Sequence, residues 1–189
     1  MQLVGEGGPE AVSVREAARR AGVSPGAPFR HFPSRDALIN AVAEEAQRRF
    51  RAEIEAELAK APPGDPLGRF RRLGIAYLRW AMQNPTHFEI ISSRRVFDHD
   101  GSAEVSGDNA ELIALTERTL AEAFAAGQLR KLDLKQVQIA GRALVYGFAR
   151  MNIDGHLPRW GVAEAELTRT AADIIDLFID GIAAPPPKV

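Results

Sequence analysis

Side chains that bind anions are concentrated near the start of the chain. Five arginines fall between Ser13 and Asp36, at positions 15, 19, 20, 30 and 35. Only Glu16 and Asp36 oppose them, so the segment carries +3, whereas the whole chain has a formal net charge of −1. Guanidinium groups bind phosphate oxygens through paired hydrogen bonds. A basic segment on an acidic chain therefore predicts one face that contacts a polyanion.

The side chains that could support catalysis do not occur in the spacing of any catalytic or metal-binding motif. The four histidines, His31, His87, His99 and His156, lack the spacing of metal ligands, and cysteine is absent. Neither a glycine-rich phosphate loop nor a nucleophile elbow occurs. We therefore expect a protein that is not an enzyme and that holds neither a metal nor a cofactor.

Composition and hydropathy place the chain among ordinary globular proteins. Hydrophobic residues make up 46% of the 189 residues and charged residues 26%. No apolar run approaches the ~20 residues of a membrane span, and the N-terminus lacks the pattern of a secretion signal. We therefore expect a cytoplasmic protein that does not enter a membrane.

The basic segment begins with a short predicted helix. Ser13 and Glu16 have the spacing of a capping box, in which each side chain accepts from the backbone amide of the other. Gly22 is expected to end the helix because glycine tolerates a positive φ. The residues between these ends form a narrow apolar stripe against which a second helix can pack closely: Val14, Ala17, Ala18 and Ala21.

A second, shorter helix is expected from Ser24 to about Arg30. Ser24 would be its N-cap, with Pro25 at the first helical position and Val23 turned inward. Pro28 removes one helical hydrogen bond to the Ser24 carbonyl, which predicts a kinked or tightened turn. Two short helices across a glycine turn form a helix-turn-helix, whose second helix enters the major groove of DNA.

Helical periodicity continues through the rest of the chain, and strand signals are almost absent. Ser34 is expected to cap a long helix that carries Leu38, Val42 and Phe50. Later helices are expected over residues 67–84, 110–126, 134–153 and 164–182. The sequence thus predicts an all-α protein, with a helix-turn-helix domain over residues 1–50, a helical domain over 51–184 and a proline-rich tail over 185–189.

The last expected helix carries apolar residues on two faces, and such a helix needs two partners to bury them. One partner is the core of its own chain, and the other is expected to be a second copy. We therefore predict a homodimer through the last two long helices. The residues assigned to its interface are Leu144, Ile175, Phe178, Ile179 and Ile182.

Large rings in the second domain suggest a cavity for a small-molecule ligand. Taken one at a time, each ring is explained better as plain core. Taken together, they favour a pocket between helices. Its expected lining is Tyr77, Trp80, His87, Phe88, Phe97, Tyr146, Phe148 and Met151.

Residues 14–38 resemble the DNA-binding motif of the TetR (tetracycline repressor) family. The shared pattern is Ala17-Ala18, then Ala21-Gly22-Val23-Ser24, then Phe29-Arg30-His31-Phe32, with Leu38 closing it. The resemblance implies a ligand-responsive repressor that binds double-stranded operator DNA as a homodimer. The residues that it assigns to DNA binding are Ser13, Arg15, Ser24, Pro25, Gly26, Ala27, Phe29, Arg30, His31 and Arg35.

Three features depart from the family's pattern. Phe29 and Arg35 stand where the family often has tyrosine and lysine. Arg142 and Tyr146 occupy the places of the tryptophan and histidine in a family C-terminal domain with a Trp-His-Gly signature. The family's first helix is expected to be truncated or missing. The alternative interpretation is therefore a helical dimer that binds a small molecule or a partner protein and has lost DNA binding.

Overall fold

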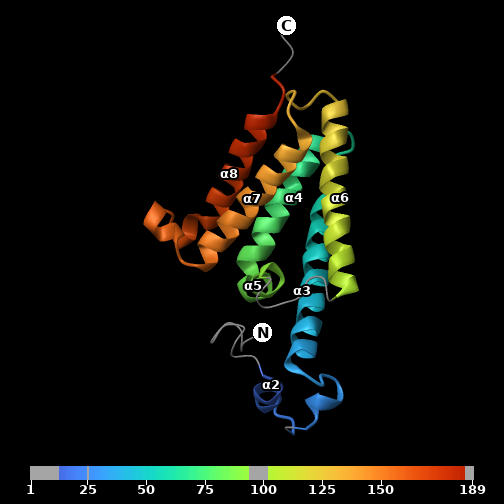
Figure 1. Ribbon diagram of the computed structural model, residues 1–189. Helices are drawn as coiled ribbons and strands as arrows, with labels where there is room; N and C mark the ends of the chain where they lie inside the picture. Colours follow the sequence, from blue (N-terminus) through green and yellow to red (C-terminus); the bar gives the residue numbers. More distant parts are fainter. Residues whose placement is uncertain (1–12, 25, 94–101, 186–189) are drawn as a thin grey trace. The chain divides into compact units, whose positions relative to one another are not determined.

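The computed structural model describes residues 13–24, 26–93 and 102–185, and its regular elements there are helices (Figure 1). This confirms the all-α prediction. The expected loss of a first helix and the tail from residue 186 onward lie outside the described residues. The α-helices are α2 (Val14–Arg20), α3 (Arg35–Leu58), α4 (Pro66–Gln83), α5 (Pro85–Ser92), α6 (Ala103–Ala125), α7 (Leu134–Ile153) and α8 (Leu167–Ile182).

Short 3₁₀ turns complete the helical content. They are η2 (Pro28–Arg30), η3 (Leu157–Trp160) and η4 (Glu164–Glu166). None of the helices in the described ranges combines the length and the apolar character needed to cross a bilayer.

The chain divides into two compact units. The first consists of residues 1–49 and 84–109, and the second of residues 50–83 and 110–189. The single boundary expected at residue 50 differs from this division, because residues 84–109 join the first unit. The long helices α3 and α6 contribute residues to both units.

The first unit has a core built from three helices. Ile39 and Ala43 of α3 are buried with Ile90 of α5 and Val105 of α6, and Leu38 packs at the edge of this cluster. The sequence-based expectations did not include α5, which begins at Pro85 and buries Phe88. Because Ile90 and Val105 fill this core, residues 84–109 belong to the first unit and not to the second.

Helix α6 begins earlier than expected. The sequence placed its start near residue 110, with Gly107 read as a loop residue, and this expectation is wrong. Ser102 caps the helix, since the amide of Val105 donates to its Oγ at 3.3 Å. The burial of Val105 then holds this first turn against the core, so Gly107 is tolerated inside a helix.

The second unit centres on α4, which packs against α7 and α8 (Figure 1). The predicted apolar stripe of α4 is buried as expected and consists of Phe70, Leu73, Tyr77, Trp80 and Ala81. Gly74 permits a close approach to α8, because a Cβ there would lie 2.9 Å from Cδ1 of Ile175. A larger residue at position 74 would require the Ile175 side chain to shift.

The end of α8 is tied to the loop before α7. Leu129 and Ala183 form an isolated antiparallel bridge, and the amide of Arg130 donates to the carbonyl of Ile182 at 3.0 Å. Ile182 is therefore buried in its own protomer, as is Ile175 against Gly74. Packing within the chain already covers both side chains, so little of either is left exposed for a partner, and their assignment to a dimer interface stays a prediction.

Candidate nucleic-acid interface

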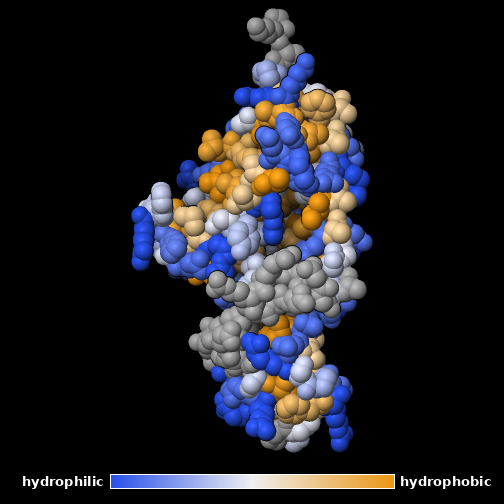
Figure 2. Space-filling view, viewed as in Figure 1, coloured by the Kyte–Doolittle hydropathy of each residue, from blue (hydrophilic) through white to orange (hydrophobic). Residues whose placement is uncertain are grey.

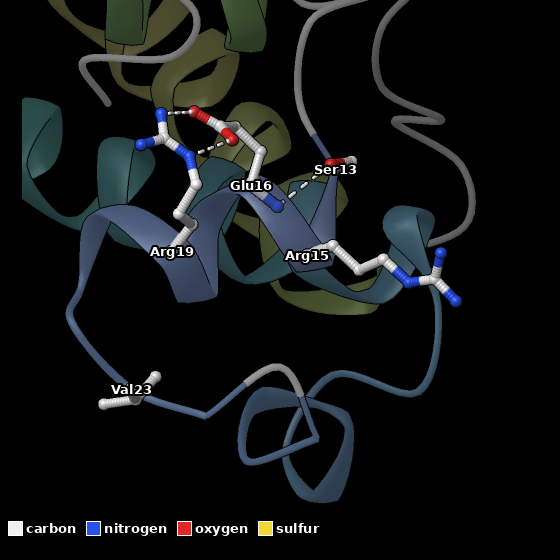
Figure 3. Close-up of a pocket in the computed structure, with 5 residues that line it drawn as sticks. All are labelled: Ser13, Arg15, Glu16, Arg19 and Val23. Atoms are coloured by element: carbon white, nitrogen blue, oxygen red, sulfur yellow. Dashed lines mark hydrogen bonds and ion pairs between the residues drawn. The ribbon is translucent and has the colours of Figure 1, made fainter.

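The basic segment begins at the N-terminus of α2. The Ser13 Oγ accepts from the amide of Glu16 at 3.1 Å, as the capping pattern predicts. The reciprocal half of the predicted box is replaced by ion pairs (Figure 3). The Glu16 carboxylate instead accepts from Arg19 Nε at 2.7 Å and from Arg20 Nε at 3.1 Å. Charge-assisted bonds to two guanidiniums are stronger than a bond to one neutral amide.

These contacts fix the charge of Glu16. Hydrogen bonds from Arg19, and then from Arg20, lower the pKa of the Glu16 carboxyl from 4.5 to about 2. The carboxylate is therefore ionised throughout the neutral range. Two of the five arginines of the segment share one counter-charge and are not fully available to another anion.

The turn after α2 follows the glycine pattern. Gly22 has a φ of +68°, and the amide of Val23 donates to the carbonyl of Ala18 at 3.1 Å, which closes a Schellman motif. The expectation that Val23 turns inward is wrong, because 47% of it is exposed. The preceding stripe ends in alanines, which offer little apolar surface for Val23 to cover.

The segment expected to be a second α-helix is tighter and shorter. Its regular part is η2, Pro28–Arg30. The amide of Ala27 donates to the Ser24 carbonyl at 3.0 Å, and that of His31 to the Pro28 carbonyl at 2.9 Å. Since proline has no amide hydrogen, position 28 cannot supply the bond that an α-helix would make to Ser24. The tightening was predicted, whereas the helical extent from residue 24 was not correct.

The side chains around η2 face solvent. Phe29 is 43% exposed, and Ser24, Gly26, Arg30 and His31 are also exposed. Pro25 lies outside the described residues. The surface around the turn thus combines one large ring, one guanidinium and a run of small residues that allow close approach of the backbone.

Two arginines of this surface have no acidic partner within the described part of the chain. Arg15 extends away from the Glu16–Arg19 pair (Figure 3), and neither Arg15 nor Arg30 forms an ion pair there. Arg35 lies 3.8 Å from the exposed Asp36 carboxylate, a weak contact. Arg15 also lines a shallow depression of about 550 Å³ with Ser13, Glu16, Arg19 and Val23.

The residues expected to line a ligand pocket fall in both units. Tyr77, Trp80 and Phe148 are buried in the second unit, where Tyr146 and Met151 are less covered. His87 and Phe88 belong to the first unit, and Phe97 lies outside the described residues. Burial, and then the nearby Arg49, lower the pKa of His87 below its usual value, which favours the neutral imidazole. The described residues contain no cluster suited to a metal ion.

Comparison with known proteins agrees with this geometry. Residues 1–42 match the tetR family of bacterial regulatory proteins, and residues 70–177 match the tetracyclin repressor-like C-terminal domain. The HTH-type transcriptional repressor KstR of Rhodococcus jostii (strain RHA1) is 34% identical over 108 residues, which is 56% of this chain. The match covers 48% of that relative's length, so the chain spans about half of it.

Solved structures share the fold over nearly the whole chain. A protein of unknown function from Rhodococcus sp. RHA1 is 27% identical with a TM-score of 0.78, covering 97% of this chain and 91% of that one. The ketosteroid transcriptional regulator KstR2 of Mycobacterium tuberculosis is 16% identical with a TM-score of 0.77, over 97% and 91%. Because the tetracyclin repressor-like match alone covers more than half of the sequence, the chain belongs to the TetR family, a family of bacterial regulatory proteins and not of enzymes.

Proposed function

We propose that the protein is a transcriptional repressor that binds operator DNA as a homodimer and releases it when a small molecule binds. The observation that carries this proposal is the exposed turn around η2, with Arg15 and Arg30 lacking any acidic partner in the described part of the chain. The similarity to the repressor KstR supports the same assignment.

The proposed DNA contacts divide into two kinds. Arg15, His31 and Arg35 would bind phosphates and position the head without reading sequence. Arg30 would read base edges in the major groove, where guanidinium groups pair with guanine. The exposed ring of Phe29 suits a thymine methyl group. The small residues Ser24, Pro25, Gly26 and Ala27 would let the backbone approach the DNA, and Ser13 would cap α2 beside it.

A homodimer would present two such heads to successive major grooves, with half-sites ~34–36 Å apart. Support for the dimer comes from α7 and α8. Leu177 is 74% exposed, and a side chain at Gly181 or Gly147 would meet no atom within 4 Å. Hydrophobic side chains gather on the surface over α8 and neighbouring α7 (Figure 2). Leu144, Phe178 and Ile179 are only half buried, so a second copy would cover them.

The effector would act through a difference in affinity. A ligand bound in the second unit can lower operator affinity only if it binds better to the conformation that fits DNA worse. Couplings of this kind are typically ~1–3 kcal/mol, about 5-fold to 150-fold in affinity.

DNA binding can be tested with the full chain. Duplexes selected from a random pool by binding to the protein would be titrated by fluorescence anisotropy across a salt series. The two phosphate-binding arginines of each protomer, Arg15 and Arg35, give four contacts in a dimer and predict that log K falls with log salt at a slope of about −4. We expect the selected sites to be palindromic. Affinity that does not change with salt, or no binding at low salt, would favour the ligand-binding or partner-binding dimer without DNA binding.

The dimer has a separate test. Leu177→Glu places a charge in the proposed interface and should give a monomer in sedimentation velocity. Leu132→Glu is the matched control, because Leu132 is also an exposed leucine, at 42%, but lies in the loop before α7. A Leu177→Glu variant that sediments like the wild-type dimer would contradict this interface.

A further inference from the structure

One arginine of the second unit is held by aromatic rings and not by a carboxylate. The guanidinium carbon of Arg142, on α7, lies 4.9 Å from the centroid of the Tyr77 ring and 5.6 Å from that of Tyr146. Arg142 is exposed. Within the described ranges of the chain, no acidic side chain forms an ion pair with it.

The other arginines of this unit that face a neighbouring helix behave differently. On α4, Arg69 pairs with Glu122, Arg71 with Asp176 and Arg79 with Glu53. Each of these guanidiniums meets a carboxylate from another helix. The positive charge of Arg142 has no such counter-charge among the described residues, and its guanidinium lies against two aromatic rings instead.

Buried aromatic residues fix the position of Arg142 on one side. Tyr77 is only 7% exposed. Its ring packs edge to face on Phe50, with the ring centroids 5.4 Å apart. Phe50 also packs on Trp80, with the ring centroids 4.9 Å apart. Burial raises the pKa of Tyr77 to about 12. Its hydroxyl is therefore neutral and can only orient the guanidinium, not balance its charge.

The other side of Arg142 is open and partly apolar. Tyr146, one turn along α7, is 36% exposed, and Ile113 of α6 is 52% exposed. Gln138, one turn before Arg142, connects these helices because its Nε2 donates to the carbonyl of Ile113 at 3.0 Å. An anchored cation thus lies on α7 next to exposed apolar side chains of α6 and α7.

We propose that Arg142, with Tyr77 and Tyr146, is the anion-receiving part of the effector site, and that the effector carries a carboxylate on an apolar body. A single guanidinium balances the one negative charge of a carboxylate and matches its two oxygens. A phosphate dianion would keep an uncompensated charge. The inference rests on the proposed function only in calling the ligand an effector.

Matched amphiphiles test the site. Decanoate, decyl phosphate and 1-decanol share an apolar chain and differ in the head group, and binding of each to the full chain can be measured by calorimetry. We expect decanoate to bind more tightly than the other two. Arg142→Gln should weaken decanoate by about 10-fold to 100-fold and leave 1-decanol within about 2-fold, since the alcohol makes no charge-assisted bond.

Two further variants separate the site from general effects of charge and folding. Arg142→Lys keeps the charge but loses the planar fork, and should give a smaller loss for decanoate. Arg118→Gln is the control, because Arg118 is an exposed arginine of α6 in the same unit, and it should bind all three probes as the wild type does. Thermal unfolding of each variant monitors the fold.

Three results would overturn the assignment: unchanged decanoate affinity in Arg142→Gln, equal affinity of the wild type for decanoate and 1-decanol, or tighter binding of decyl phosphate. The operator-binding assay keeps the two proposals apart. Decanoate binding that depends on Arg142 in a protein that binds no DNA would contradict the repressor and retain the site. DNA binding with no preference for decanoate would do the reverse.

Discussion

The arginines of α4 and two arginines of the helix-turn-helix segment, Arg15 and Arg30, are the same side chain in opposite electrostatic settings. Arg71 reaches Asp176 across 105 residues of sequence, and Arg72 and Arg79 share Glu57. Arg15 and Arg30 form no ion pair within the described part of the chain. A guanidinium that is balanced by a carboxylate supports helix packing, whereas one without a counter-charge can bind an external anion.

Two glutamates, Glu16 and Glu57, each have a pKa that neighbouring arginines lower to about 2. Glu57 is 6% exposed and joins α3 to α4, whereas Glu16 lies at the surface of α2 and pairs with Arg19 and Arg20. The same pKa therefore has different consequences. At Glu57 the ion pairs join two packed helices, and at Glu16 they reduce the positive charge exposed on the surface of α2.

The largest expected effect comes from removing the unpaired charges of the head. The double variant Arg15→Ala with Arg30→Ala should lose at least about 100-fold in affinity for a selected duplex. Its salt slope should become shallower by about 2 in a dimer, because only Arg15 of each protomer is assigned to phosphate. The thermal midpoint should not change, since neither arginine forms an ion pair in the described ranges. Arg118→Ala serves as the control, and equal affinity of the double variant and the wild type would show that Arg15 and Arg30 do not contact DNA.

The next effect concerns stability. Glu57→Gln leaves Arg72 and Lys60 without their carboxylate and weakens the contact of Arg79. We expect the free energy of unfolding in urea to fall by about 2 kcal/mol, less than for a fully buried pair because the partners are partly exposed.

Glu55→Gln is the control for this stability change. Its carboxylate is 64% exposed and pairs with Arg51, so the change should be under about 0.5 kcal/mol. Equal stability of Glu57→Gln and the wild type would show that this ion-pair cluster does not support packing.

The pH dependence of the free energy of unfolding is a second test of Glu57, because it compares wild type and variant over a range of conditions. Because Arg79 lowers the pKa of Glu57 from 4.5 to about 2, the charged form stabilises the native state fully above pH 4.5 and progressively less as the pH falls toward 2. The difference in unfolding free energy between wild type and Glu57→Gln should therefore stay constant above about pH 5 and shrink below it. A difference that persists unchanged at pH 3 would assign the effect to packing instead.

The smallest expected effect is a gain of DNA affinity. Glu16→Gln removes the carboxylate that Arg19 and Arg20 share, so the head gains positive charge. Affinity for duplex DNA should rise several-fold with a steeper salt dependence. Glu104→Gln is the matched control, because Glu104 is an exposed partner of Arg48 elsewhere in the first unit. A Glu16→Gln variant with unchanged affinity would place these arginines away from the DNA.

Much of the candidate site was predictable because its determinants are local. The Ser13 cap, the positive φ of Gly22 and the Ser34 cap each depend on residues three or four positions apart. The effect of Pro28 was also predictable, although its consequence, a 3₁₀ turn in place of a helix, was underestimated. The exposure of Val23 was not predictable, because it depends on how little surface the neighbouring alanines offer.

The helical class, most helix positions, the basic segment and the resemblance to the family were predictable from the amino-acid sequence, because periodicity, caps and motif depend on residues close together in the chain. Three-dimensional packing determines that α5 and the start of α6 complete the core of the first unit. It also determines that Ile175 is buried against Gly74 and that Arg142 meets rings and not a carboxylate. These contacts join residues tens of positions apart, and burial and charge pairing depend on which side chains the packed helices bring together.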